Sequence, residues 1–131
     1  MLAVGITHRL EVEVLEADTA RAVGSGGLDV LATPRLAALM EQACFESVEP
    51  LLEVGKTSVG SHLDIKHQAP SLVGSRIAVE SLLEAVDGRQ LTFSLRATDA
   101  AGIIAEAIHE RFIVDTSHFL NRAAHRTKKN S

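Results

Sequence analysis

Tryptophan and tyrosine are absent from this chain of 131 residues, and phenylalanine occurs four times. A surface that stacks several nucleic-acid bases needs exposed aromatic rings, so a base-stacking platform is not expected. The formal net charge of −4 at pH 7 gives no general attraction to phosphate backbones either. The sequence therefore predicts no nucleic-acid partner.

Cysteine is also nearly absent, because Cys44 is the only one. A single cysteine excludes an internal disulfide and a thiolate metal cluster. No residue near Cys44 in the sequence favours a reactive thiolate, so we expect Cys44 to pack in the core rather than to act as a nucleophile.

Long hydrophobic runs are missing too. No apolar segment approaches the ~20 residues that span a bilayer, and the first residues lack the apolar region of a secretory signal. We therefore expect no membrane partner and a cytoplasmic location. The length and the 46% share of hydrophobic residues fit one globular domain, which we place at residues 1–120. A polar, basic C-terminal tail is expected at 121–131, with its last seven residues disordered.

Alternating patterns predict a sheet. In residues 7–17, Leu10, Val12 and Val14 alternate with Glu11 and Glu13, as in a half-buried strand. Further strands are predicted at 58–67, 76–86, 90–99 and 103–114, and Asp87-Gly88 is a hairpin signal between the second and third of these. The last segment also fits a helix by periodicity, but its β-branched residues and the preceding Asp-Ala-Ala-Gly turn favour a strand.

One long helix is predicted between the first strand and the others. It follows a loop with three glycines and runs from about Pro34 to Val48, with Thr33 as N-cap and Pro50 after its end. The broad apolar face of this helix is formed by Leu36, Ala37, Leu39, Met40, Ala43, Cys44 and Val48. One strand, one helix and several consecutive strands indicate an α+β domain in which the helix packs against a curved antiparallel sheet.

Two titratable residues do not fit the apolar surfaces on which they lie. Glu41 falls at the edge of the apolar helix face, and a carboxylate there needs either a partner or a cleft. His67 shares strand parity with Val59, Leu63 and Ile65, so it is expected to point inward. Each residue alone is more often structural, but two such groups on separate elements are typical of a pocket.

Together these residues resemble the fluoroacetyl-CoA thioesterase family of the hot-dog fold. The likeness covers residues 5–120 and is best in ATPRLAALMEQAC, in GSHLDIKH and in HERFIV. The spacing from Thr33 to Glu41 and from Glu41 to His67 is that of the family's catalytic Thr, Glu and His. The resemblance implies a hot-dog fold with a long central helix, a homodimer with its site between subunits, and an acyl-CoA thioesterase that needs no cofactor and no metal.

The same resemblance implies roles for three further residues. Gly60, His109 and Arg111 match family positions and are expected to contact the substrate, with His109 and Arg111 at the pantetheine or nucleotide part of coenzyme A. A structural role for these two is an equal alternative. The family member that acts on fluoroacetyl-CoA carries bulky aromatic residues just before the helix, whereas this chain has Gly-Ser-Gly-Gly. We therefore expect a small acyl-thioester other than fluoroacetyl-CoA.

The sequence favours this interpretation over three alternatives. A metal site at His62, Asp64 and His67 is disfavoured because the two histidines have opposite strand parity. A hot-dog hydratase is disfavoured because no Asp with a His a few residues later lies on a helix. A non-catalytic protein that binds or senses acyl-thioesters has no need to retain Thr33, Glu41 and His67 together.

Overall fold

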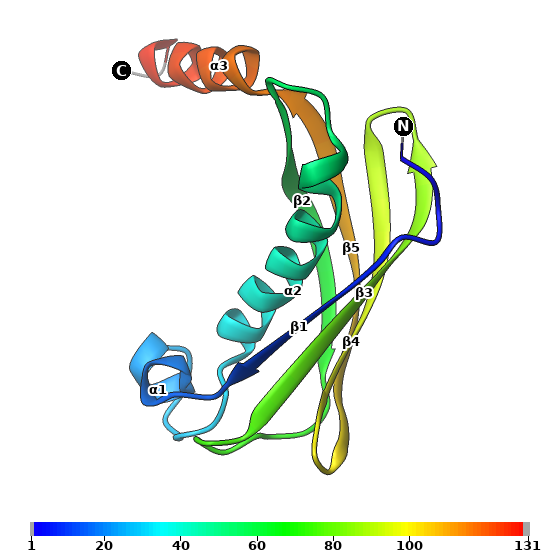
Figure 1. The fold of residues 1–131 in the computed structure, drawn as a ribbon. Helices are drawn as coiled ribbons and strands as arrows, with labels where there is room; N and C mark the ends of the chain where they lie inside the picture. The colour runs from blue at the N-terminus through cyan, green and yellow to red at the C-terminus, as the bar shows by residue number, and fades with distance from the viewer. Residues whose placement is uncertain (1, 130–131) are drawn as a thin grey trace.

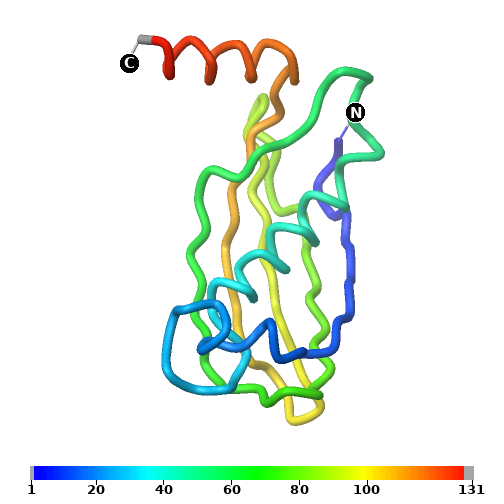
Figure 2. Tube along the Cα trace, turned by 90° about the vertical axis from the view of Figure 1, so that its left-hand side faces the viewer, coloured from blue at the N-terminus to red at the C-terminus, as the bar shows by residue number. Residues whose placement is uncertain are grey.

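The computed structural model describes residues 2–129. Its five strands form one antiparallel sheet with the order β1-β3-β4-β5-β2, so that β1 and β2 are the edges. The strands are Thr7–Glu13 (β1), Lys56–His67 (β2), Arg76–Asp87 (β3), Gln90–Asp99 (β4) and Gly102–Asp115 (β5). The sheet curves around the long helix Thr33–Val48 (α2), which runs along its concave side (Figure 1). This is the predicted architecture, and Figure 2 shows α2 crossing the sheet obliquely.

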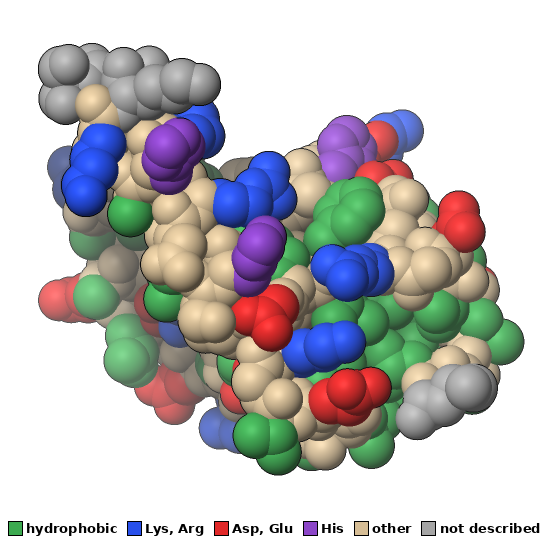
Figure 3. Space-filling model, turned by 90° about the horizontal axis from the view of Figure 1, so that it is seen from above, with side chains coloured by type: hydrophobic (Ala, Val, Ile, Leu, Met, Phe, Trp, Pro, Cys, Tyr) green, Lys and Arg blue, Asp and Glu red, His purple; other side chains and the backbone are tan. Residues whose placement is uncertain are grey.

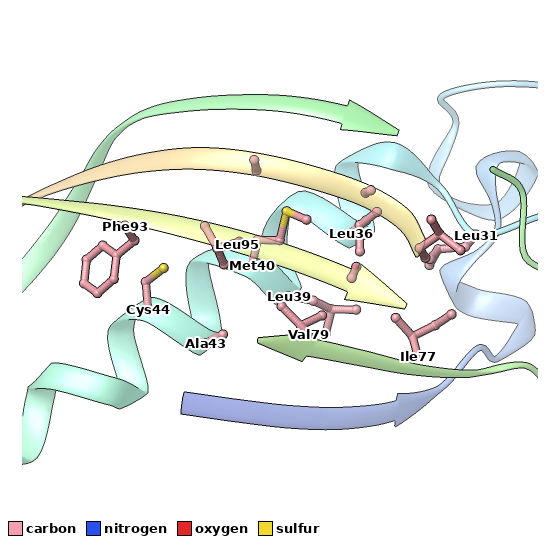
Figure 4. Close-up of a cluster of buried hydrophobic side chains, with 14 of the residues drawn as sticks. Leu31, Leu36, Leu39, Met40, Ala43, Cys44, Ile77, Val79, Phe93 and Leu95 are labelled. Atoms are coloured by element: carbon pink, nitrogen blue, oxygen red, sulfur yellow. The ribbon is translucent and has the colours of Figure 1, made fainter. Parts of the chain in front are cut away.

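The hydrophobic core fills the space between α2 and the sheet. Six of the seven residues predicted for the apolar helix face are buried, and Ala37 is half-buried. They meet side chains from β3, β4 and β5, which point toward the helix (Figure 4). The largest fully buried side chains are Phe93, Leu36, Leu39, Met40, Ile77, Leu83, Leu91, Ile104, His109, Val14, Val48 and Val79. His109 is the only titratable member of this group.

The predicted hairpin joins β3 and β4. Asp87 pairs with Gln90 across the turn, and Gly88 has a positive φ of 59°, which a glycine adopts without strain. Residues 103–114 form most of β5, so the strand rather than the helix is confirmed there. The alternation in β1 is also confirmed, because Leu10, Val12 and Val14 all pack on the core.

The prediction for β2 was wrong at one position. The register between β2 and β5 shifts between Gly60 and His62, so Ser61 is an extra residue in β2. A bulge of this kind reverses which residues face the core. Leu63 and Ile65 pack on the core as expected, whereas Val59 does not. The predicted alternation therefore holds for the residues after the bulge, including His67, but not for Val59, which lies before it.

The start of α2 also differs from the prediction. Ala32, not Thr33, is the N-cap, and no side chain caps the helix. Thr33 is the first helical residue and Pro34 the second. The hydroxyl group of Thr33 is thereby free of the capping role and points to another element. The glycine-containing loop before α2 is preceded by two short helices that the sequence did not predict, Glu16–Asp18 (η1) and Ala20–Val23 (α1), and a third, Glu49–Leu51 (η2), follows α2.

The C-terminal prediction of disorder was wrong as far as Lys129, because Thr116–Lys129 forms a helix (α3). Residues 130 and 131 of the predicted tail lie outside the described residues. α3 extends away from the sheet at the end of β5, and Lys, Arg and His side chains gather around it (Figure 3). Among residues 2–129, no helix is long and apolar enough to cross a membrane.

Candidate active site

Thr33 and His67 meet where the first turn of α2 lies against the end of β2. Thr33 Oγ1 is 2.8 Å from Nδ1 of His67, which is hydrogen-bond distance. The two residues are 34 positions apart in the sequence. The contact is possible because His67 lies on the same side of β2 as Leu63 and Ile65 and because Thr33 is not used as a cap.

The surroundings of His67 favour a neutral imidazole. Burial lowers the pKa of His67, and a backbone interaction with Ala69 opposes that shift only in part. Nε2 of the ring is buried and has no hydrogen-bond partner among the described residues. In a neutral ring with an unprotonated Nδ1, that nitrogen accepts a hydrogen bond from the Thr33 hydroxyl group, and a neutral imidazole can take up a proton during a reaction.

A cleft opens directly over this pair. It has a volume of about 590 Å³ and is walled by residues before α2 and after β2. Most of the wall is small or apolar, and its residues are Ala20, Ser25, Val30, Leu31, Thr33, Pro34, His67, Gln68, Ala69 and Pro70. In the first turn of α2, Pro34 has no N–H and the N–H of Leu36 donates to the Ala32 carbonyl, so the donors that this turn leaves available are the N–H groups of Thr33 and Arg35. The cleft can thus hold a small acyl group beside two polar side chains.

Glu41 has a charged partner, as expected for a carboxylate at the edge of an apolar helix face. Its Oε1 lies 3.7 Å from Nη1 of Arg111, and 48% of its side chain is exposed in the single chain. The carboxylate is therefore paired on one side and open on the other. It lies two turns further along α2 than Thr33, about 12 Å at 1.5 Å per residue.

Arg111 and His109 lie in the core beneath Glu41. Arg111 Nε donates to Oγ of Ser58 (2.8 Å), and Nη2 donates to the Ser58 carbonyl (2.9 Å). His109 Nδ1 donates to the carbonyl of His62 at 2.7 Å, which leaves Nε2 to accept from Nη1 of Arg111 at 3.2 Å. Burial, followed by the positive charge of Arg111, lowers the pKa of His109, although the hydrogen bond to His62 opposes the shift. His109 is thus a neutral acceptor for the guanidinium group.

Gly60 lies where these side chains converge. A Cβ atom on Gly60 would collide with Oε1 of Glu41, and it would lie 3.2 Å from Cε1 of His109 and 3.4 Å from Nη1 of Arg111. The position has no positive φ, so the backbone conformation alone does not require glycine. What requires it is the close approach of Glu41 to the strand.

The predicted site residues thus form two groups within one protomer. Thr33 and His67 share the cleft, whereas Glu41 joins Gly60, His109 and Arg111. Ser58 belongs to the second group but was missed, since a serine on a strand carries no distinctive signal in the sequence. Its β2 parity with Gly60 was the one available clue.

Cys44 and a metal site are the two other features for which the sequence raised a chemical role. Burial raises the pKa of the Cys44 thiol to about 12, which agrees with a packing role. Among the described residues, no three His, Cys, Asp or Glu side chains are placed to hold a metal ion.

Comparisons with known proteins agree with this architecture. The sequence model of the fluoroacetyl-CoA-specific thioesterase family matches residues 14–117. The fluoroacetyl-CoA thioesterase of Streptantibioticus cattleyicolor is 31% identical over 99 residues, which cover 76% of this chain and 71% of that protein. The solved structure of the fluoroacetyl-CoA thioesterase FlK superposes with a TM-score of 0.90 at 27% identity, covering 95% of this chain and 97% of that one. A Thermus thermophilus hypothetical protein described as a thioesterase superfamily member gives 0.89 at 25% identity, with 99% and 96% covered.

Proposed function

The chain belongs to the fluoroacetyl-CoA-specific thioesterase family, and we propose that it hydrolyses a small acyl-CoA thioester with Thr33, Glu41 and His67. The observation that carries this proposal is the contact between Thr33 Oγ1 and His67 Nδ1 at the floor of a cleft. A hydroxyl group, a neutral imidazole and a helix N-terminus converge there, and they suit the attack on a carbonyl group.

The reaction needs a nucleophile, a site for the developing oxyanion and a path for the leaving thiolate. Glu41 either attacks the carbonyl carbon and displaces the thiolate to give a mixed anhydride that water then hydrolyses, or acts as the general base that takes a proton from the attacking water. The free backbone N–H groups at the start of α2 stabilise the oxyanion, and the Thr33 hydroxyl group joins them when it turns its proton from His67 to the substrate. His67 either takes a proton from the attacking water or gives a proton to the leaving sulfur. Because a free thiol has a pKa near ~8.5, the thiolate leaves with little assistance.

The separation of Glu41 from Thr33 within one protomer supports a site shared between two. β2 is an edge strand, whose free N–H and C=O groups are a ready surface for pairing with a second copy. Antiparallel pairing of two β2 strands about a two-fold axis would set the C-terminal half of each strand, which carries His67, against the N-terminal half of the other, which lies beside Glu41. The homodimer would then combine Thr33 and His67 of one protomer with Glu41 of its partner.

Subunit complementation tests this shared site. His67→Ala and Glu41→Gln chains, carrying different tags, are co-expressed and the mixed dimer is purified. If each site takes His67 from one protomer and Glu41 from the other, the mixed dimer has one intact site and regains activity. If each protomer holds a whole site, both sites of the mixed dimer stay defective. Sedimentation of the wild-type chain should also show a dimer, and a stable monomer of 14.0 kDa would rule the arrangement out.

The walls of the cleft support an acyl group other than fluoroacetyl. Ala20 begins α1, Ser25 and Val30 lie in the loop between α1 and α2, and none of the three is aromatic. The space above Thr33 and His67 is therefore wider than a two-carbon acyl group requires. A cytoplasmic location stays a prediction.

Thiol release from a panel of acyl-CoA thioesters of increasing chain length tests the function. We expect turnover that depends on acyl length and fluoroacetyl-CoA as a poor substrate. Release of no thiol from any acyl-CoA would contradict the proposed function. Tight binding without release would instead support a non-catalytic binding protein.

A further inference from the structure

Arg111 is a charged side chain almost fully inside the protein, with 5% of its surface exposed. Burying a charged guanidinium group is costly unless hydrogen bonds and nearby charges compensate. Burial lowers the pKa of Arg111, but an arginine starts so high that it stays charged at neutral pH. The buried charge of Arg111 is therefore expected to have a specific role inside the protein.

The contacts of Arg111 fix its guanidinium group from three elements. Ser58 on β2 accepts two hydrogen bonds, from Nε and from Nη2. His109 on β5 accepts from Nη1, and the Cζ atom lies 5.8 Å from the ring centroid of Phe45 on α2. A guanidinium plane with bonds along two edges and an aromatic ring beside it has little freedom to turn.

Only Glu41 in this group has freedom to move. Its carboxylate lies 3.7 Å from Nη1 of Arg111, outside hydrogen-bond distance but within that of an ion pair. The missing side chain of Gly60 leaves the space into which Oε1 fits. Attraction by Arg111 and the space at Gly60 thus select one position of the carboxylate from the many that a half-exposed glutamate could adopt.

We propose that Arg111 is a positioning residue that aims the Glu41 carboxylate, and that Ser58 and His109 hold Arg111 in place for this purpose. This inference rests on the proposed role of Glu41 in hydrolysis. It assigns Arg111 and His109 to the support of Glu41 rather than to the binding of coenzyme A. Neither side chain is open to a ligand in the single chain, since 1% of His109 and 5% of Arg111 are exposed.

Steady-state kinetics on Arg111→Met separate the two roles, with the best acyl-CoA from the panel as substrate. Methionine fills the buried volume but removes the charge and all hydrogen bonds. If Arg111 aims Glu41, kcat should fall on the order of 10²-fold, as expected for a misplaced catalytic group, while KM changes little. If Arg111 binds coenzyme A, KM should rise and kcat should persist. Arg96→Met, which removes an exposed arginine from β4, is the matched control and should change neither constant.

A double-mutant cycle with Ser58→Ala keeps the inference testable even if Arg111→Met folds poorly. Ser58→Ala removes only one acceptor of Arg111, so it should lower kcat by a smaller factor with KM unchanged. Arg111→Lys retains the charge without the planar contacts and should recover part of the lost kcat. Ser58→Ala should lower kcat no further in the Arg111→Lys background, because its effect passes through the guanidinium group.

The outcomes distinguish this inference from the proposed function. If the wild-type protein is active and folded Arg111→Met keeps full kcat, the positioning role is wrong and the proposed function stands. The same conclusion follows if the wild-type protein is active and both Ser58→Ala and Arg111→Lys keep full kcat. A wild-type protein that releases no thiol from any acyl-CoA would overturn the proposed function, and the positioning role with it.

Discussion

Thr33 on the first turn of α2 and His67 at the last position of β2 share a hydrogen bond of 2.8 Å. This contact joins the central helix to an edge strand beside an open cleft. Replacing Thr33 with Ala removes the hydroxyl group but leaves the backbone N–H groups of the helix start. We expect Thr33→Ala to lower kcat less than His67→Ala does. Equal losses of kcat in the two variants would mean that the hydroxyl group is as essential as the imidazole.

The stability of the protein should depend on pH through two histidines. Burial lowers the pKa of both His67 and His109 in the folded state, whereas the unfolded chain holds them near ~6.5. The unfolded state therefore binds more protons below that value, and the free energy of unfolding should decrease as the pH falls through about 6.5. Thermal midpoints from about pH 7.5 to 5.5 measure this, and His67→Gln should reduce the slope. The same slope in His67→Gln and wild type would show that His67 does not contribute.

The close approach at Gly60 predicts a local defect. In Gly60→Ala, the new methyl group should displace the end of the Glu41 side chain, which is flexible enough to move. The fold should persist, with a thermal midpoint near that of wild type, while kcat falls. Gly27→Ala is the control, because a Cβ there meets no atom within 4 Å and the position has no positive φ. A Gly60→Ala protein with wild-type kcat would show that the position of the carboxylate is not important.

Cys44 should be inert to thiol reagents in the folded protein. It is fully buried, and its thiol pKa is raised to about 12 by that burial. We expect no reaction with a disulfide reagent until the chain is denatured, and full turnover in Cys44→Ala. Loss of turnover in a folded Cys44→Ala protein would identify the thiol as part of the reaction.

The width of the cleft should control acyl preference. Ser25 lies in its wall, and the large ring in Ser25→Phe would occupy part of the space over Thr33 and His67. The ratio of kcat/KM for longer acyl groups to that for acetyl-CoA should therefore decrease. An unchanged ratio across the acyl-CoA panel would place the acyl group elsewhere.

Most of the fold could be predicted because its elements carry strong periodic signals. The apolar face of α2 and the alternation of β1 could be predicted from the sequence, since each element has one buried and one exposed side. The Asp87-Gly88 turn was readable because few residues adopt its backbone conformation. The bulge at Ser61 was not, because an extra residue in a strand depends on the pairing with β5 and has no local signature.

The site could be predicted only in part. Glu41 was found because a carboxylate beside an apolar face is unusual, and its need for a partner is met by Arg111. Thr33 was assigned as a cap, since the sequence alone does not show that Ala32 takes that position. The separation of Thr33 from Glu41 follows from eight residues of helix, about 12 Å at 1.5 Å per residue, whereas the contact of His67 with Thr33 depends on the path of β2, which only the structure provides.

The comparison of kcat with the thermal midpoint for Glu41→Gln shows whether Glu41 acts on the thioester or serves only as the partner of Arg111. Glutamine keeps the shape of the side chain and removes its charge. If Glu41 acts on the thioester, the fold should persist while hydrolysis of acyl-CoA falls by on the order of 10²-fold or more. If Glu41 is only the ion-pair partner of Arg111, the thermal midpoint should shift and turnover should not. A Glu41→Gln protein that unfolds at lower temperature yet hydrolyses acyl-CoA at the wild-type rate would show that Glu41 is structural and not catalytic.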